Sequence, residues 1–402
     1  MKKNLKTVLL YLFLPVVLFF SFIKKIYFIK FCKIDEKFGQ VLRFTEGFLI
    51  SKKYYNFPEI ENCKIIFLLK YKDCNEQQVK MVKRVLKVFN LSLFYYFLIN
   101  AFIYWNKKEH IIDMGENYPL KKLLLKNDKN PYDFYKKNFI YFTQIEENKA
   151  KEHLSKFGLK QDDKWICITN RDENYKNKKY KNFDWSYHNY RNFSVNSLKE
   201  AANFFASKGY YVFRMGSMQK ETLDCDNPKI IDYANNKLKN QFMDIYLLGN
   251  CEFYFGGDTG PSDISFHFRK PAYGINFSST MIDYGRSHLP WLFTVKRIQN
   301  NFNGKLLTLK EILDSKFAQS CSFHDFVENN VLPIENSAKE VKLFAEEVYS
   351  SFQEEKYDNQ EDFNNQKKFW EIYYSKVPKS CMGQIQPKIS SSFLRNNIDL
   401  LS

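Results

Sequence analysis

The chain of 402 residues contains little arginine and lacks the patterns by which nucleic-acid-binding proteins are recognised. Nine of its 61 basic residues are Arg, and the other 52 are Lys. The net charge is +16, yet no dense basic block and no zinc-finger spacing is present, so we expect no nucleic acid among the partners. Such a basic surface fits an anionic lipid leaflet or a phosphorylated substrate better.

Metal-binding and nucleophile patterns are also missing. The eight cysteines form no CxxC pair and several lie in apolar runs, which predicts reduced, buried thiols. The six histidines have no metal-ligand spacing, and neither a GxSxG elbow nor a Cys/His nucleophile pattern is visible. Asp224 and Asp226 match a DxD pattern that can hold a metal ion, but they lie in a polar stretch where the pattern arises by chance. We therefore predict no metal site and no cofactor.

One long apolar run is present, near the N-terminus. Residues 7–23 are interrupted only by Pro15 and Ser21, and lysines flank the run on both sides. A membrane span needs about 20 residues, and no small-residue cleavage site follows. We expect residues 1–33 to form a membrane-associating helix, either lying in the interface or acting as a short signal anchor. The alternative is an unusually apolar first helix of the N-terminal domain.

Length and hydrophobic periodicity predict two α/β domains without internal repeats. We assign residues 34–162 to an N-terminal, acceptor-side domain and place the boundary near Asp162. Its expected elements are a strand at 64–69, a helix at 79–89, a buried helix at 91–105, a strand at 110–114 and a helix at 143–157.

Residues 163–335 alternate between strands and helices. The expected strands are 165–170, 210–214, 229–232, 251–256 and 271–276, and the helices are 197–209, 240–248 and 261–269. This alternation of near-continuous apolar strands with helices predicts a parallel sheet covered on both faces, with ligands at the carboxyl ends of its strands. Helices near 339–350 and 362–374, within residues 336–402, are expected to pack back across the two domains.

A glycine-rich turn is the sharpest local signal. Residues 256–263 read GGDTGPSD, follow an expected strand and open an expected helix. Glycines let a backbone approach a ligand closely, and free N–H groups at a helix start favour an anion. The positions that we single out are Gly257, Asp258, Thr259, Gly260 and Ser262. The turn lacks the Walker lysine and the GxGxxG spacing, so it is neither an ATP loop nor a dinucleotide fingerprint. A tight strand-to-helix turn without a ligand is the alternative.

The placement of arginine supports a phosphate site. Six of the nine arginines lie between residues 171 and 297, and Arg171 and Arg214 directly end expected strands. The planar guanidinium binds phosphate oxygens in pairs, which lysine cannot imitate. Each arginine alone could be a surface ion pair, but two at equivalent strand ends, beside the glycine turn, favour a bound phosphate.

Residues 166–277 resemble a family of bacterial glycosyltransferases that are found in surface-polysaccharide gene clusters. The matching stretches are ICITNRD, YRNF, GYYVFRMG, IIDYAN, FMDIYLLGNCEFYFGGDTG and FRKPAYGIN, with ISSSFLRNN at 389–397. The glycine turn also resembles the DTG or DSG turn of heptosyltransferases, in which a following His is common. Asp263 stands at that position here, so heptose chemistry is not inferred.

The resemblance implies a GT-B architecture, in which two Rossmann-like domains face a cleft and the C-terminal one binds the donor without an obligatory metal. The resemblance also implies which residues form or shape the donor site. These candidate positions are Arg171, Asp172, Arg191, Asn192, Arg214, Gly216, Asp258, Thr259 and Gly260. In the N-terminal domain the family usually has Arg and His where this chain has Lys37 and Gln40, which leaves Glu46 as the candidate catalytic base.

Our hypothesis from the sequence is a glycosyltransferase at the cytoplasmic face of a bacterial inner membrane. It would move a sugar from a nucleotide-diphosphate donor to a glycan or lipid-linked acceptor in O-antigen, capsule or lipopolysaccharide biosynthesis. Arg171 and Arg214 would neutralise the leaving diphosphate, and Glu46 would deprotonate the acceptor hydroxyl. The alternatives are a sugar-nucleotide epimerase on the same scaffold, and a membrane-tethered polysaccharide-binding protein without enzymatic activity.

Overall fold

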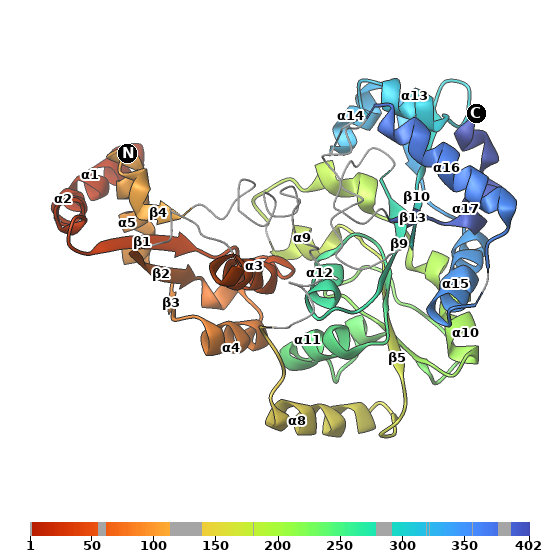
Figure 1. Ribbon diagram of the computed structural model, residues 1–402, viewed down its shortest axis with the longest axis horizontal. Helices are drawn as coiled ribbons and strands as arrows, with labels where there is room; N and C mark the ends of the chain where they lie inside the picture. Colours follow the sequence, from red (N-terminus) through yellow and green to blue (C-terminus); the bar gives the residue numbers. More distant parts are fainter. Residues whose placement is uncertain are drawn as a thin grey trace. The chain divides into compact units, whose positions relative to one another are not determined.

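A computed structural model describes residues 2–54, 62–112, 139–179, 181–278, 292–318, 320, 322–355, 357–376 and 387–402. The chain divides into two units, Met1–Thr143 and Gln144–Ser402 (Figure 1). This division lies N-terminal to the expected boundary near Asp162, because helix α8 (Gln144–Ser155) packs on α11 (Gln241–Asn250) of the second unit. The hydroxyl of Tyr246 on α11 donates a hydrogen bond of 2.7 Å to Glu147 on α8.

The first unit contains a four-stranded parallel sheet in the order β3-β2-β1-β4. The strands are β1 (Phe28–Lys33), β2 (Cys63–Leu69), β3 (Val88–Asn90) and β4 (Ile111–Ile112), and helices α3 (Gln40–Tyr54) and α4 (Glu76–Val85) connect them. Strand β2 confirms the strand expected at 64–69. Residues 28–33, which we assigned to the membrane-associating segment, instead form the inner strand β1. Phe31 and Cys32 of β1 are buried, so this stretch belongs to the core.

The apolar N-terminal run forms two helices, α1 (Lys2–Leu12) and α2 (Leu14–Ile23). The helix breaks at Phe13 because Pro15 has no N–H with which to continue the hydrogen-bond ladder. Both helices pack on α5 (Leu93–Tyr104), and Leu10, Val17 and Phe102 join one apolar cluster with β1. Among the residues that the structure describes, no helix combines the length and the hydropathy that a membrane crossing requires.

Helix α5 differs from our expectation of a buried helix at 91–105. Only Leu98, Ala101 and Phe102 of this helix are buried, whereas Leu93 is 77% exposed. Its composition is apolar all round, yet it packs on the unit along one side only. The prediction of complete burial is therefore wrong.

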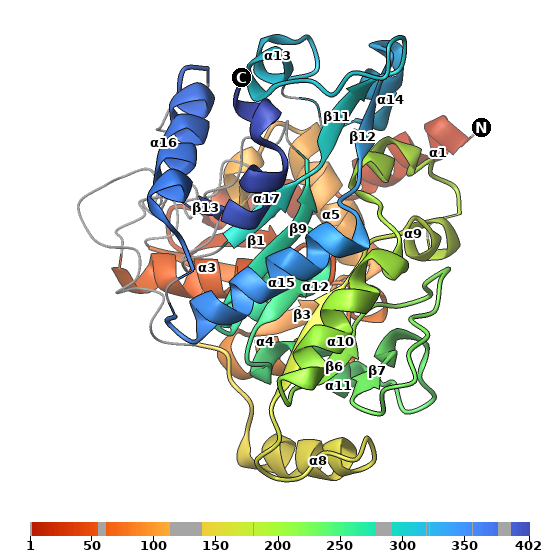
Figure 2. The same cartoon turned by 90° about the vertical axis from the view of Figure 1, so that its right-hand side faces the viewer.

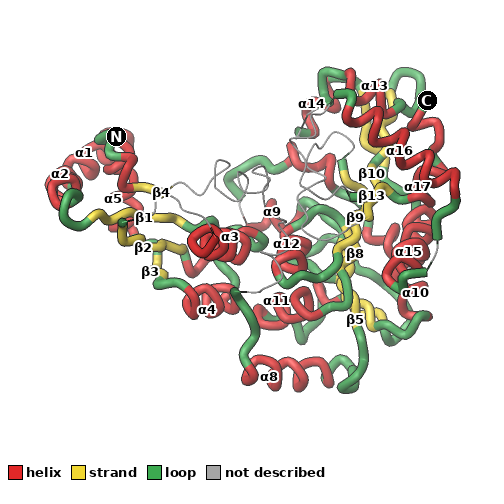
Figure 3. Tube along the Cα trace, in the orientation of Figure 1, coloured by secondary structure: helices red, strands yellow, loops and turns green. Residues whose placement is uncertain are grey.

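The second unit is built on a seven-stranded parallel sheet in the order β13-β10-β9-β8-β5-β6-β7. Figure 3 draws its strands in yellow and labels β5, β8, β9, β10 and β13. The strands are β5 (Trp165–Thr169), β6 (Tyr211–Arg214), β7 (Ile230–Ile231), β8 (Tyr254–Gly256), β9 (Ala272–Phe277), β10 (Leu292–Val295) and β13 (Lys388–Ile389). The five strands expected from the sequence are confirmed, and β10 and β13 add two that we did not expect. A separate antiparallel pair is formed by β11 (Arg297–Asn300) and β12 (Val331–Ile334).

Side chains that alternate along β5 explain how helices cover both faces of this sheet. Ile166 and Ile168 pack against α10 (Lys199–Ser207) and α15 (Ala338–Phe352), which lie side by side over one face (Figure 2). On the other face, the side chains of Trp165 and Cys167 donate hydrogen bonds to the carbonyl of Leu247 in α11. The period of two expected for a strand thus produces the α/β layering that the sequence predicted.

The strand order creates a switch point between β5 and β8. From β5 the chain proceeds outward through β6 and β7 on one side, and it then crosses to β8, β9 and β10 on the other. Open parallel sheets bind ligands in the crevice outside the carboxyl ends of the strands at such a reversal. Arg171 follows β5 and the glycine turn follows β8, so both of these predicted features lie at the switch point.

The C-terminal residues complete the second unit. Besides α15, they include α16 (Gln360–Tyr374), α17 (Ser391–Asn396) and strand β13, which pairs with β10. Glu347 of α15 is 1% exposed and accepts hydrogen bonds from the Ser390 hydroxyl and from the backbone N–H groups of Ser391 and Ser392, at 2.6–2.9 Å. This buried carboxylate holds the first turn of α17 against α15.

Replacing Glu347 by Gln should destabilise the second unit by about 2 kcal/mol, because an amide NH₂ then faces N–H donors in a buried site. Chemical denaturation followed by circular dichroism measures the change. Glu346→Gln, at the adjacent and more exposed position on α15, should stay within about 0.5 kcal/mol of the native chain. Equal midpoints for the two variants would contradict the role of Glu347.

Candidate anion-binding site

Three separate segments meet at the carboxyl edge of the second unit's sheet. Asn170 and Arg171 follow β5, the glycine turn 257–259 joins β8 to α12 (Gly260–His267), and Lys296 directly follows β10. A fourth segment, residues 189–193, lies against them through the hydrogen bonds described below. These segments are far apart in the sequence and come together only through the strand order.

Close packing explains the first two glycines of the turn. A Cβ atom on Gly256 would lie 2.5 Å from the backbone oxygen of Thr169, and one on Gly257 would lie 2.7 Å from the Phe193 ring. Both distances are too short for any other residue. Packing within the fold is therefore enough to require glycine at these two positions. This agrees with the alternative interpretation of the motif, a tight strand-to-helix turn without a ligand.

Tyr254, the first residue of β8, holds the glycine turn in place through its hydroxyl group. The buried hydroxyl of Tyr254 contacts the Thr169 hydroxyl, donates to the carbonyl of Gly257 at 2.7 Å and lies 3.1 Å from the Thr259 hydroxyl. Burial raises the pKa of Tyr254 well above its usual value, so this hydroxyl stays protonated. The sequence analysis did not single out Tyr254, although it lies two residues before the glycines.

The rest of the turn reaches the surface. Asp258, Thr259 and Gly260 are half-buried, whereas Ser262 is buried and its hydroxyl donates 2.7 Å to the carbonyl of Thr259. Ser262 therefore supports the turn. The first turn of α12 remains the part of the motif that a ligand can approach.

Cationic side chains surround Asn192 beside this turn. Arg171 donates through Nη1 to the Asn192 side-chain oxygen and, at 3.0 Å, to the carbonyl of His188. Lys296 donates to the backbone carbonyl of Asn192. The neighbouring Arg191 forms an ion pair of 3.0 Å with Asp258 in the turn. The predicted residues Arg171, Arg191, Asn192 and Asp258 thus lie together, and Lys296 joins them.

The electrostatics of this cluster indicate crowded positive charge. Burial, together with the charge of Arg191, lowers the pKa of the Arg171 guanidinium to about 10. Burial likewise lowers the pKa of Lys296 to about 8; nearby Glu335 raises it and Arg171 lowers it. Cations whose charged forms are disfavoured in this way are stabilised when an anion binds beside them. The cluster, formed by Arg171, Arg191 and Lys296, is called the cation cluster below.

Arg214 does not belong to the cation cluster. It is fully buried, and its Nε and Nη2 donate to the Asn170 side-chain oxygen at 3.2 and 2.9 Å. Its Nη1 donates to Asp232 at 3.0 Å, and Nη2 also donates to Gln219 at 3.2 Å. A guanidinium with all three nitrogens engaged and no exposed surface cannot grip a diphosphate, so the predicted catalytic role of Arg214 is corrected to a positioning role.

That positioning acts through Asn170. While its side-chain oxygen accepts from Arg214, its Nδ2 donates to the carbonyl of Phe193 at 3.2 Å. Phe193 is the residue that packs on Gly257 and follows Asn192. Arg214 therefore acts through Asn170 on residues 189–193, the segment that carries Arg191.

The remaining candidates in the second unit organise loops. Asp172 accepts from the backbone N–H groups of Asn174 and Lys220, at 2.9 and 2.8 Å. Gly216 has a φ of +149°, and a Cβ there would collide with the Gln219 side chain. Both residues shape the chain around Arg214 and β5 rather than presenting free groups to a ligand.

Glu46, the candidate base, lies in the first unit on α3 and is 4% exposed. Its assignment as the base stays a prediction. Asp224 and Asp226 are exposed in the loop between β6 and β7, as expected. Within the described ranges, no group of three or more His, Cys, Asp or Glu side chains could hold a metal ion.

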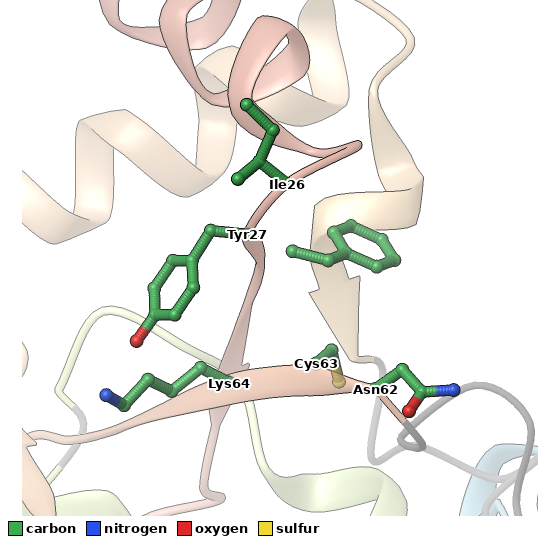
Figure 4. A pocket seen from close by; sticks show the side chains of 6 residues that line it. Ile26, Tyr27, Asn62, Cys63 and Lys64 are labelled. Atoms are coloured by element: carbon green, nitrogen blue, oxygen red, sulfur yellow. The ribbon is translucent and has the colours of Figure 1, made fainter.

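A surface hollow of about 340 Å³ lies in the first unit (Figure 4). It is lined by Ile26, Tyr27, Phe28, Asn62, Cys63 and Lys64. These residues begin β1 and β2, so the hollow lies at the amino ends of the strands. Parallel sheets bind ligands at the opposite edge, and we assign it no part in the site.

Exchanging Arg214 for Lys should lower the stability of the second unit by about 3 kcal/mol, because one ammonium cannot satisfy the buried Asn170, Asp232 and Gln219 together. Denaturant titration followed by circular dichroism measures the loss. Arg84→Lys in the first unit, where the guanidinium is exposed and donates to the Tyr141 carbonyl, should leave the second unit's transition unchanged. A fully stable Arg214→Lys chain would refute the positioning role.

Comparisons with known proteins give distant structural likenesses. No protein-family model matches the chain, and no curated protein does so. A Veillonella parvula protein of glycosyl transferase family 9 shares 12% identity over 65% of this chain and 85% of its own, with a TM-score of 0.37. The E. coli ADP-heptose LPS heptosyltransferase II shares 9% over 66% and 85%, with a TM-score of 0.40. An E. coli heptosyltransferase with ADP shares 11% over 64% and 87%, with a TM-score of 0.31. TM-scores below 0.5 carry no argument about activity; the α/β fold with parallel sheets is established by the strand pairing itself.

Proposed function

We propose that this protein is a metal-independent glycosyltransferase of the GT-B type that uses a nucleotide-diphosphate sugar as donor. The observation that carries the proposal is the cation cluster. It combines Arg171, Arg191 and Lys296 from separate segments, beside the first turn of α12, at the switch point of a parallel sheet. The sequence resemblance to surface-polysaccharide glycosyltransferases covers the segments of Arg171, Arg191 and the turn, but not that of Lys296.

In this proposal the diphosphate of the donor lies between the cation cluster and the turn 258–260. Arg191 is already balanced by Asp258, so Arg171 and Lys296 supply the charge that neutralises the leaving diphosphate as the glycosidic bond to it breaks. The backbone N–H of Gly260, at the start of α12, adds a donor for a phosphate oxygen, whereas Pro261 has no N–H and that of Ser262 donates to the carbonyl of Thr259. Arg214 and Tyr254 contribute by holding the cluster and the turn in place.

The acceptor side of the reaction is proposed on the resemblance. A carboxylate of the first unit, with Glu46 as the candidate, accepts the proton of an acceptor hydroxyl that attacks the anomeric carbon. The acceptor is a glycan or a lipid-linked glycan in the assembly of bacterial surface polysaccharide, which places the reaction at the cytoplasmic face of the inner membrane. The abundance of basic residues is compatible with such anionic, lipid-linked substrates.

Thermal denaturation of the full chain with ADP, UDP, GDP and their common sugar conjugates tests the donor site. A ligand present at about 100 times its Kd stabilises the folded state by about 2.7 kcal/mol and raises Tm by several degrees. Arg171→Gln should remove at least half of that rise. Arg297→Gln is the matched control, because Arg297 pairs with Glu340 outside the cluster. The proposal fails if no nucleotide raises Tm, or if both variants keep the full rise.

Lys296 predicts a specific pH dependence of donor binding. Its pKa of about 8 means that the ammonium is charged at pH 7 and largely neutral by about pH 9, whereas the terminal phosphate, with a second pKa of about 6, is already mostly ionised at pH 7. Affinity for the nucleoside diphosphate should therefore fall by about tenfold over that interval. Lys296→Arg should hold its affinity nearly constant, because the guanidinium stays charged. Calorimetric titrations at both pH values would contradict the assignment if the two proteins showed the same decline.

Product analysis separates the proposed reaction from its alternatives. A glycosyltransferase releases a nucleoside diphosphate and lengthens an acceptor, whereas an epimerase returns an altered nucleotide sugar without any acceptor. A polysaccharide-binding protein without activity would leave the nucleotide sugar unbound and unchanged.

A further inference from the structure

Exposed apolar side chains are concentrated in one part of the first unit. Of 25 large apolar side chains that are strongly exposed in the described residues, 13 lie within residues 8–27 and 93–104. These are Val8, Tyr11, Leu12, Leu18, Phe19, Phe22, Ile26, Tyr27, Leu93, Phe94, Tyr96, Ile103 and Tyr104. Water-soluble surfaces scatter such residues singly, so a concentration of this kind marks an interaction site.

Eleven of these exposed residues lie on three helices, α1, α2 and α5. Helices α1, α2 and α5 pack on one another (Figure 1). The Tyr11 ring of α1 lies 6.2 Å from the Tyr104 ring and 5.0 Å from the Trp105 ring at the end of α5. Phe13, between α1 and α2, lies 5.4 Å from Phe94 at the start of α5. We call the exposed sides of these three helices the apolar face.

In the chain segments that carry the apolar face, the only charged side chains are positive. No Asp or Glu occurs in residues 1–34 or in residues 91–108. Lys24 and Lys25 follow α2, and Lys107 and Lys108 follow α5. The first carboxylate reached from α5 is Glu109, which pairs with Lys24 at 3.5 Å. An apolar centre with lysines at its edges is complementary to a bilayer that contains anionic lipid.

The aromatic residues of the face support the same partner. Tyr11, Tyr96 and Tyr104 are all between 47% and 53% exposed, so each offers an apolar ring and a hydroxyl to the surroundings. Tyrosine and tryptophan are enriched at the level of the lipid headgroups because they match both environments. Protein–protein interfaces also use tyrosine, but they are depleted in lysine, so the lysines beside these tyrosines favour a lipid surface.

We propose that α1, α2 and α5 together dock in the plane of an anionic lipid bilayer, without any of them crossing it. Helix α5 extends the membrane-binding surface beyond the N-terminal helices. Its buried side contacts the core through Leu98, Ala101 and Phe102, while Leu93 and Phe94 project on the exposed side. The attachment is therefore a three-helix surface of the folded unit and not an N-terminal tail. This inference is independent of the proposed function.

Flotation of the full chain with lipid vesicles tests the proposal. Vesicles of phosphatidylcholine mixed with phosphatidylglycerol should carry the protein upward, and pure phosphatidylcholine vesicles should carry much less. Leu93→Glu on α5 and Phe22→Glu on α2 should each lower the partition coefficient by about tenfold, because a charge then enters the apolar layer.

Two exposed positions in the second unit provide matched controls. Phe302 is 81% exposed, as is Phe22, and Ile145 is 80% exposed, close to the 77% of Leu93. Phe302→Glu and Ile145→Glu should float like the native chain. The proposal is overturned if the native chain does not float, if Leu93→Glu floats as well as Ile145→Glu, or if light scattering shows a dimer that only the Leu93→Glu and Phe22→Glu variants lose.

Discussion

The pairing of β5 with β6 on one side and β8 on the other is the constraint on which the second unit depends. It creates the switch point, and it brings the ends of two neighbouring strands so close that Gly256 must lie against the Thr169 backbone. Because β8 lies directly beside β5, the turn that follows β8 lies beside the residues that follow β5. The cation cluster and the first turn of α12 therefore meet as a consequence of strand order.

Arg171 and Arg214 show how burial separates two residues that look equivalent in the sequence. Each ends or directly follows a strand, and each has a guanidinium suited to phosphate. Arg214 has an acidic partner, Asp232, and two amide oxygens within 3.2 Å, which compensate for its complete loss of solvent. Arg171 has only oxygen atoms of uncharged groups as hydrogen-bond partners, and its pKa falls to about 10. The guanidinium whose hydrogen-bond partners include no carboxylate is the one that an anion would stabilise.

In the first unit, apolar segments are buried to different extents. Residues 7–23 and 93–104 have the composition of buried or membrane-embedded helices, and residues 28–33 combine four apolar residues with Lys30 and Lys33. In the fold, the last of these becomes an inner strand, whereas the first two bury one side and expose the other. The same physical property, low affinity for water, is thus used for core formation in β1 and is left exposed on α1, α2 and α5.

Local pattern determined much of the second unit. The apolar run of β5, the helix that closes at Gly209 and the strand-to-helix turn at 256–263 are set by neighbouring residues, and the sequence alone predicted them together with the α/β class. Hydrogen-bond partners that are distant in sequence decided the rest. Lys296 reaches Asn192 across 104 positions and Arg214 reaches Asn170 across 44. Periodicity carries no information about such partners, because they are set by the order of the strands. Only the tertiary structure could therefore bury Arg214, add Lys296 to the site and leave one side of α5 uncovered.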